Sequence, residues 1–302
     1  MAQNALGILV LLREVTDPRP PAQLSEEGAL IRDRGLRRIP NPADLAALEE
    51  ALAQAAGFPG AAVTALAVGP PRVDDLLRWA VAMGAHRAIR IWDDHQALEG
   101  ADASADAALL ERCLEIFRPD LWITGSRLLD RGDAPGPALA CARAGLPHVD
   151  AAAGLRISDG GIRVTRRADR GARQELELPL PAGVFVEAGI RRPRYPDMER
   201  VLAALEAEIE VWGLPDLGLP AAAVGEAAAR LARLGYRFPR PDPLRVPTPD
   251  PRWPAPQRTA ALLSGGIQPR AGRIRFGTAA EVVDALLEIF TQEGLLPAGG
   301  AP

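Results

Sequence analysis

Short apolar runs alternate with amphipathic stretches through the first two thirds of the chain. Continuous apolar runs at 8–13, 63–68, 88–92, 121–124 and 184–186 predict buried strands, because both faces of a parallel sheet are covered. Helical spacing predicts helices from Pro42 onward, over 74–83 and over 106–117. This alternation predicts an α/β fold: a Rossmann-like parallel sheet with helices on both faces.

The pattern changes after residue 150. Two alternating runs, 155–157 and 162–164, flank Asp159-Gly160-Gly161, and alternation returns over 174–178. Alternation around such a turn predicts an antiparallel hairpin extension of the sheet.

The last third of the chain is looser. Residues 221–234 predict one more helix, and prolines are so dense over 238–256 that we expect an extended arm. A final amphipathic helix over 278–293 carries an apolar stripe, with Val282, Val283, Leu286, Leu287 and Phe290. We therefore predict a nucleotide-binding domain over 1–218 and a region over 219–302 that ends in an arm and helix. The stripe packs either on its own domain or on a partner subunit.

Composition excludes several function classes. All 35 basic residues are arginine, so Schiff-base lysines and the P-loop lysine are excluded. A net charge of −4 argues against nucleic-acid binding. The three histidines are widely spaced, so we predict no metal site. Cys113 and Cys141 are expected on buried helix faces. The apolar run at 7–12 is too short for a secretory signal and predicts a buried strand of a cytoplasmic protein.

The candidate site is the loop that follows the strand at 121–124. It runs from Gly125 to Pro137, where Pro137 suits the first turn of a helix. Loops at the carboxyl ends of parallel strands hold ligands in open α/β sheets, and helix N-termini favour phosphate. The same pattern also fits an ordinary connection between a strand and a helix that binds no ligand.

Six segments fall in the order seen in one known family. They are 39–42 with 48–51, 80–88, 125–137, 191–196, 216–218 and 256–260. In this order they resemble the β subunit of electron transfer flavoprotein. The resemblance covers residues 8 to about 218 and resumes over 256–296.

The resemblance implies an α-type partner that holds most of an FAD, and an adenine nucleotide, AMP or a second FAD, in this chain. The implied nucleotide contacts are Leu11, Asn41, Pro42, Ala43, Asp44, Val68, Gly125, Ser126, Arg127, Leu128, Leu129, Asp130, Arg131, Gly132, Asp133, Ala134 and Gly136. An asparagine can hydrogen-bond a ribose or base. The alternative for Asn41-Pro42 is an ordinary turn and helix start.

The loop departs from the family pattern. Family loops usually read Gly-Lys-Gln-Ala-Ile-Asp and end in Thr-x-Gln-x-Gly, whereas this chain has Ser126 and Arg127 after Gly125 and lacks that threonine and glutamine. Arg127 and Arg131 either supply phosphate charge instead or are solvated loop residues.

A second departure follows Tyr195. Family members carry a leucine-containing loop that docks onto dehydrogenases, followed by a lysine-rich helix. Here Met198 stands in the place of the leucine, and the basic cluster is absent. The resemblance therefore implies docking through Tyr195, Met198 and Val201. Alternatively, Met198 and Val201 are core positions of an amphipathic helix.

These expectations lead to an electron-carrier subunit with no catalytic residue of its own, because the flavin carries the redox chemistry. It would pass electrons from a flavin dehydrogenase to a quinone reductase or similar acceptor. The alternative is a redox-inactive nucleotide-binding scaffold or sensor subunit. A ligase or pyrophosphatase, suggested by Ser264-Gly265-Gly266, fails because that loop does not follow the first strand.

Overall fold

The computed structural model describes residues 6–20, 36–93, 102–158, 161–231, 249–263, 274, 276–293 and 295. The chain divides into two units, Met1–Arg237 and Phe238–Pro302. No helix within these described ranges is both long and apolar enough to cross a membrane.

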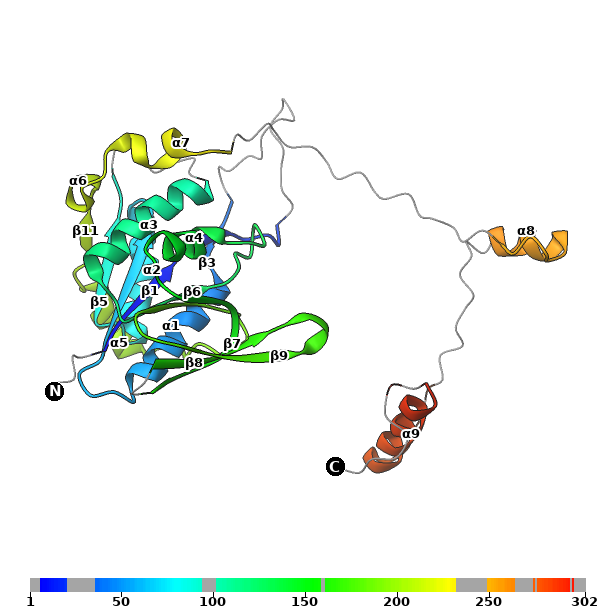
Figure 1. Cartoon of the computed structure of the whole chain (residues 1–302). Helices are drawn as coiled ribbons and strands as arrows, with labels where there is room; N and C mark the ends of the chain where they lie inside the picture. Colours follow the sequence, from blue (N-terminus) through cyan, green and yellow to red (C-terminus); the bar gives the residue numbers. More distant parts are fainter. Residues whose placement is uncertain are drawn as a thin grey trace. The chain divides into compact units, whose positions relative to one another are not determined.

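A mostly parallel sheet forms the centre of the first unit (Figure 1). Its parallel strands are β1 (Gly7–Leu12), β4 (Ala62–Val68), β5 (Arg87–Ile91), β6 (Leu121–Gly125), β7 (His148–Ser158), β10 (Ala182–Val186) and β11 (Glu210–Trp212). In the described chain the sheet order is β11-β5-β4-β1-β6-β10-β7-β8-β9. All five predicted strands are confirmed, and the fold is the expected α/β class.

Helices cover both faces of this sheet. On one face, α1 (Pro42–Ala55) and α2 (Asp74–Met83) share a hydrophobic core with alternate residues of β1, including Ile8 and Val10. On the other, α3 (Ala103–Phe117) and α4 (Pro135–Arg143) pack on Leu9 and Leu11. The strand at the centre is therefore apolar throughout because successive side chains enter two different cores.

The antiparallel extension is confirmed. The long strand β7 pairs in parallel with β10 and then with β8 (Gly161–Arg167), which pairs with β9 (Arg173–Leu178). Asp159 and Gly160 of the expected turn lie outside the described residues. Ile162 and Val164 pack into the core on the α1 side of the sheet.

Several short elements were not predicted. β2 (Glu14–Thr16) and β3 (Arg38–Pro40) form a small antiparallel sheet. Strand β11 and α6 (Leu214–Leu217) were not predicted either, whereas α5 (Met198–Leu205) is the amphipathic helix given as the alternative after Tyr195.

The helix predicted over 221–234 is wrong for its described part. A 3-10 turn at Ala221–Ala223 is followed by a single turn, α7 (Gly225–Ala228), and residues 229–231 are not helical. Val224 is extended and Gly225 has a φ of 60°, so the backbone breaks where the apolar pattern continues. These turns contact α3 in the first unit.

The second unit contains two described helices. The first, α8 (Ala255–Leu263), starts at the end of the expected arm, with Pro256 in its first turn; residues 238–248 of that arm lie outside the described part. The second, α9 (Ala279–Gln292), confirms the predicted helix. Thr278 caps it, and Glu281 bonds back to the Thr278 N–H at 2.8 Å. Such a capping box fixes where a helix begins.

Candidate functional site

The strand order reverses at β1, and we use the word crevice for the region at the carboxyl ends of β1, β4 and β6. From β1 the chain adds β4 and β5 on one side and then returns to β6 on the other side of β1. Ligands in open α/β sheets bind outside the carboxyl ends of the strands at such a switch point. The structure brings the predicted segments 41–44 and 125–129 together at this edge. Leu11 lies in β1 and Val68 ends the neighbouring β4.

Asp44 holds the ends of β1 and β6 together. Its carboxylate, 1% exposed, accepts the Arg13 Nη2–H at 2.6 Å and the Nε–H at 3.0 Å. It also accepts the backbone N–H groups of Arg13 at 2.9 Å and Gly125 at 2.8 Å. Arg13 Nη2 in turn donates to the Gly125 carbonyl at 2.7 Å. We call Arg13, Asp44 and Gly125 the latch; it satisfies a buried charge from several sides, as a buried carboxylate requires.

Asn41 fixes the course of the candidate loop. Its side chain is buried, donating to the Arg127 carbonyl at 2.9 Å and accepting the Leu129 N–H at 3.2 Å. A second tie joins the loop to β2, where the Thr16 N–H donates to Asp130 Oδ2 at 3.1 Å. In this structure the Asn41 amide therefore shapes the loop directly.

Gly125 is required by the close approach of β6 to α1. A Cβ added at this position would lie 2.5 Å from Ala43 Cβ and 2.5 Å from Asp44 Oδ1. Ala43 is itself buried. Only a residue without a side chain lets the loop leave the sheet here.

The outer part of the loop carries its charges. Arg127 and Arg131 are exposed, and Arg131 Nε lies 4.0 Å from Asp130 Oδ1. Ser126, Leu128 and Ala134 are half-buried, Gly132 and Asp133 are exposed, and Gly136 is buried against α3. The exposed guanidinium groups are the positive charges that the loop offers to an anion.

The first turn of α4 is poor in backbone donors. Pro135 and Pro137 occupy it, which confirms Pro137 as a first-turn residue, but neither has an N–H group. Ala134, the residue before the helix, makes no side-chain cap. The sequence predicts backbone N–H groups of this helix as the anion site. With few such donors present, an anion here would depend mainly on the arginine side chains of the loop.

Three further residues of the crevice were missed from the sequence: Arg13 of the latch, Thr124 and Asp106. Thr124 donates through Oγ1 to the Leu11 carbonyl at 2.9 Å inside the sheet. Asp106 of α3 keeps solvent contact, yet burial by the surrounding protein raises its pKa, while Arg131 and Arg13 act to lower it. Arg13 had a sequence signal, a charge directly after a buried strand; Asp106 had none.

The predicted docking residues lie on a different part of the unit. Tyr195 is 86% exposed and Met198 is 70% exposed, so Met198 is not a core position. Val201 is half-buried on the side of α5 that holds the buried Ala204. Helix α5 packs against α2. The Tyr195 ring lies edge-on to the Trp79 ring of α2, with 5.4 Å between the ring centroids.

The two cysteines are buried as predicted, Cys113 in α3 and Cys141 in α4. Burial raises the pKa of each thiol to about 12. Both are therefore inert packing residues at neutral pH.

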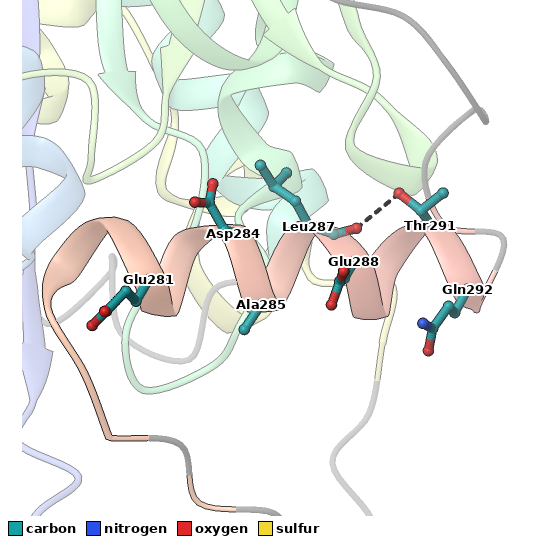
Figure 2. A pocket seen from close by; sticks show the side chains of 7 residues that line it. All are labelled: Glu281, Asp284, Ala285, Leu287, Glu288, Thr291 and Gln292. Atoms are coloured by element: carbon teal, nitrogen blue, oxygen red, sulfur yellow. Dashed lines mark hydrogen bonds between the residues drawn. The ribbon is translucent and has the colours of Figure 1, made fainter.

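A hollow on α9 does not compete with the crevice. Figure 2 shows that it is lined only by residues of that helix: Glu281, Asp284, Ala285, Leu287, Glu288, Thr291 and Gln292. The Thr291 hydroxyl donates to the Leu287 carbonyl within the helix at 2.8 Å. One helix presents a surface and cannot enclose a ligand.

Comparison with known proteins agrees with this geometry. The family model of the electron transfer flavoprotein domain matches residues 29–217. The chain is 30% identical over 225 residues to the electron transfer flavoprotein subunit beta of Methylophilus methylotrophus, covering 74% of this chain and 84% of that protein. It is 31% identical over 221 residues to the caffeyl-CoA reductase-Etf complex subunit CarD of Acetobacterium woodii, covering 73% and 83%.

A mycobacterial relative extends the match. The subunit beta of Mycobacterium leprae is 29% identical over 267 residues, covering 87% of this chain and 95% of that protein. The family is flavin-associated, and its β subunits are electron carriers that pair with an α-type subunit. The chain therefore belongs to the electron transfer flavoprotein family, as a β-type subunit.

Proposed function

We propose that this chain pairs with an α-type subunit in the cytoplasm and forms a carrier between a flavin dehydrogenase and a quinone reductase or similar acceptor. The partner holds most of the FAD, which supplies the redox chemistry, so this chain needs no acid–base residue of its own. The observation that supports this most is the switch-point crevice, whose segments 41–44 and 125–129 lie within the family match.

We propose that the crevice also holds an adenine nucleotide, AMP rather than a second FAD. The residues fit it in part. Arg127 and Arg131 are exposed beside the loop and can take up phosphate charge, while Asp106 and the two prolines of α4 act against a phosphate. Losing one charged contact costs roughly 1.5–3 kcal/mol, or about one to two decades in affinity. We therefore expect weak binding and partial occupancy.

The nucleotide is tested by denaturing the purified complex and quantifying released AMP and FAD by chromatography. We expect AMP below one equivalent, rising when the protein is purified with added AMP. Two FAD per heterodimer would overturn the AMP assignment. No AMP even after this addition would make the crevice purely structural.

We propose that donors dock on an apolar surface formed by Tyr195, Met198, Leu202 and Leu205, the docking face. These side chains are 57–86% exposed, and the last three share one side of α5 at helical spacing. Apolar anchors of this kind carry much of the binding energy of an interface. Because α5 carries one basic residue, Arg200, and no basic cluster, the matching donor surface should not be strongly acidic.

Met198→Ala tests the docking face. Truncating one anchor commonly costs about 1–2 kcal/mol, so transfer at limiting donor should slow about five- to thirtyfold. Flavin content should not change. Leu231→Ala, an apolar residue outside α5 that is 77% exposed against 70% for Met198, is the control. Unchanged transfer rates would remove Met198 from the interface.

The assembly is tested by co-expressing the full chain with an α-type subunit of the same family from the same organism. A carrier predicts a single yellow heterodimer on size exclusion. A stable but colourless heterodimer would favour the scaffold alternative. Separate elution of the two chains would overturn the proposed assembly.

A further inference from the structure

The segment that carries the docking face is tied to α1 by two arginines. Arg191 Nε donates to Glu50 Oε2 at 2.6 Å. Three residues later, Arg194 donates to Glu49 through Nε and Nη2, both at 2.8 Å, and through its backbone N–H at 3.0 Å. The loop between β10 and α5 is thus held at two neighbouring points.

The two ties differ from ordinary surface ion pairs. Glu50 is 2% exposed and Glu49 is 7% exposed, in the middle of a helix that packs on the sheet. A carboxylate in such a place is costly unless it is paired and hydrogen-bonded. A two-point arginine–carboxylate bond also fixes direction as well as distance. The carboxylates therefore define where the loop lies.

The Glu50 carboxylate is itself oriented by Gln54. Gln54 Nε2 donates to Glu50 Oε1 at 2.7 Å and to the Leu155 carbonyl at 2.9 Å. The same Gln54 accepts the Ile157 N–H at 3.2 Å. The acceptor that meets Arg191 is thus oriented by β7 through one amide side chain.

Besides the two ties, the docking face is supported by α2, against which α5 packs. Tyr195 directly follows Arg194 and touches Trp79 with its ring edge. Helix α5 has 8 residues, Asp197 caps it, and Ala204 is its buried side chain. A helix this short is not stable alone, so its position depends on its packing against α2 and on what holds its N-terminal end.

We propose that Glu49 and Glu50 are positioning residues that hold the docking face in place through Arg194 and Arg191. That these ties serve docking rests on the proposed function. That they hold the loop in place rests on the bonds of the four side chains alone. Its first consequence is local: cutting either tie loosens residues 191–205 and leaves the sheet intact.

The test is hydrogen–deuterium exchange of the full chain in complex with its α-type subunit, followed by mass spectrometry of peptides over 188–206. Arg194→Gln and Glu49→Gln should each speed exchange in these peptides at least tenfold, with β1 and β6 unchanged. Arg194→Lys, which keeps the charge but loses the two-point bond, should lie between these variants and the wild type. Because both changes break one contact, the double variant should add little to either single variant.

The matched control is Arg163→Gln. Arg163 also pairs with a glutamate through Nε and Nη2, but both donate to one oxygen, Glu177 Oε1, at 3.0 and 2.6 Å, on the exposed side of the β8–β9 hairpin. It should leave exchange over 188–206 at the wild-type rate. Unchanged exchange in Arg194→Gln and Glu49→Gln, or exchange that rises equally throughout the sheet, would overturn the proposal. Flavin content and electron transfer do not enter this readout, so a failed electron-carrier function would leave the result intact.

Discussion

Replacing Asp44 by asparagine removes the negative charge of the latch and keeps its shape. Asp44 is 1% exposed and its partner Arg13 is 17% exposed. Removing one partner of a buried ion pair costs about 3–5 kcal/mol. Because water can reach part of the guanidinium, we expect the lower end for Asp44→Asn, about 3 kcal/mol. For a domain of this size this corresponds to a fall in Tm of about 6–12 °C.

The assay is urea and thermal unfolding followed by circular dichroism at neutral pH. Asp75→Asn is the control, because Asp75 is also acidic and near a helix start but is exposed. It should change the free energy of unfolding by about 1 kcal/mol or less. A loss below about 1 kcal/mol in Asp44→Asn would refute the reasoning that the latch holds the ends of β1 and β6 together.

Three further predictions concern packing, pH and assembly. Gly125→Ala places a Cβ 2.5 Å from Ala43 of α1 and should lower the free energy of unfolding in urea by about 1–3 kcal/mol. Gly189→Ala, with open space around it, should change it little, and equal effects of the two variants would contradict the close approach. Burial raises the pKa of Glu49, but its bonds to Arg194 outweigh this and hold the pKa below its ordinary 4.5. The stability from this pair is therefore present above pH 4.5 and lost as pH falls below it. The loss of unfolding free energy in Arg194→Gln should therefore shrink as the pH is lowered, and a loss that stays constant with pH would contradict this reasoning. Ending the chain after Gly235 removes the apolar stripe of α9. Burying three of its side chains on a partner is worth roughly 5–8 kcal/mol before ordering costs, so this truncation should abolish the heterodimer on size exclusion. An intact heterodimer would contradict a role of this stripe in assembly.

The parts of the fold that the sequence predicted are those governed by local pattern. Strand β6 is a continuous apolar run because both of its faces are covered, and α9 begins directly after Thr278 because that residue and Glu281 complete a capping box. The helix expected over 221–234 failed because Gly225 takes a left-handed backbone conformation that apolar spacing does not reveal.

The meeting of the candidate segments was predictable from the sequence, but the bonds of their side chains were not. The order of β1, β4, β5 and β6 places segments 41–44 and 125–136 at one edge, as the chain order implies. The latch depends on a pairing between Arg13 and Asp44, 31 residues apart, which no short-range pattern encodes. Likewise, Asn41 has a side chain that suits a nucleotide, and only its burial against the loop shows what it bonds.

The central claim, that this β-type subunit forms part of an electron carrier, is tested most directly by a reductive titration of the purified complex with its α-type subunit. The absorbance of the flavin is followed while dithionite is added without oxygen and an oxidant is then added back. The account predicts one FAD per heterodimer, bleached by reduction and fully restored by reoxidation. A stable heterodimer without flavin, or with flavin that cannot be reduced and reoxidised, would contradict it.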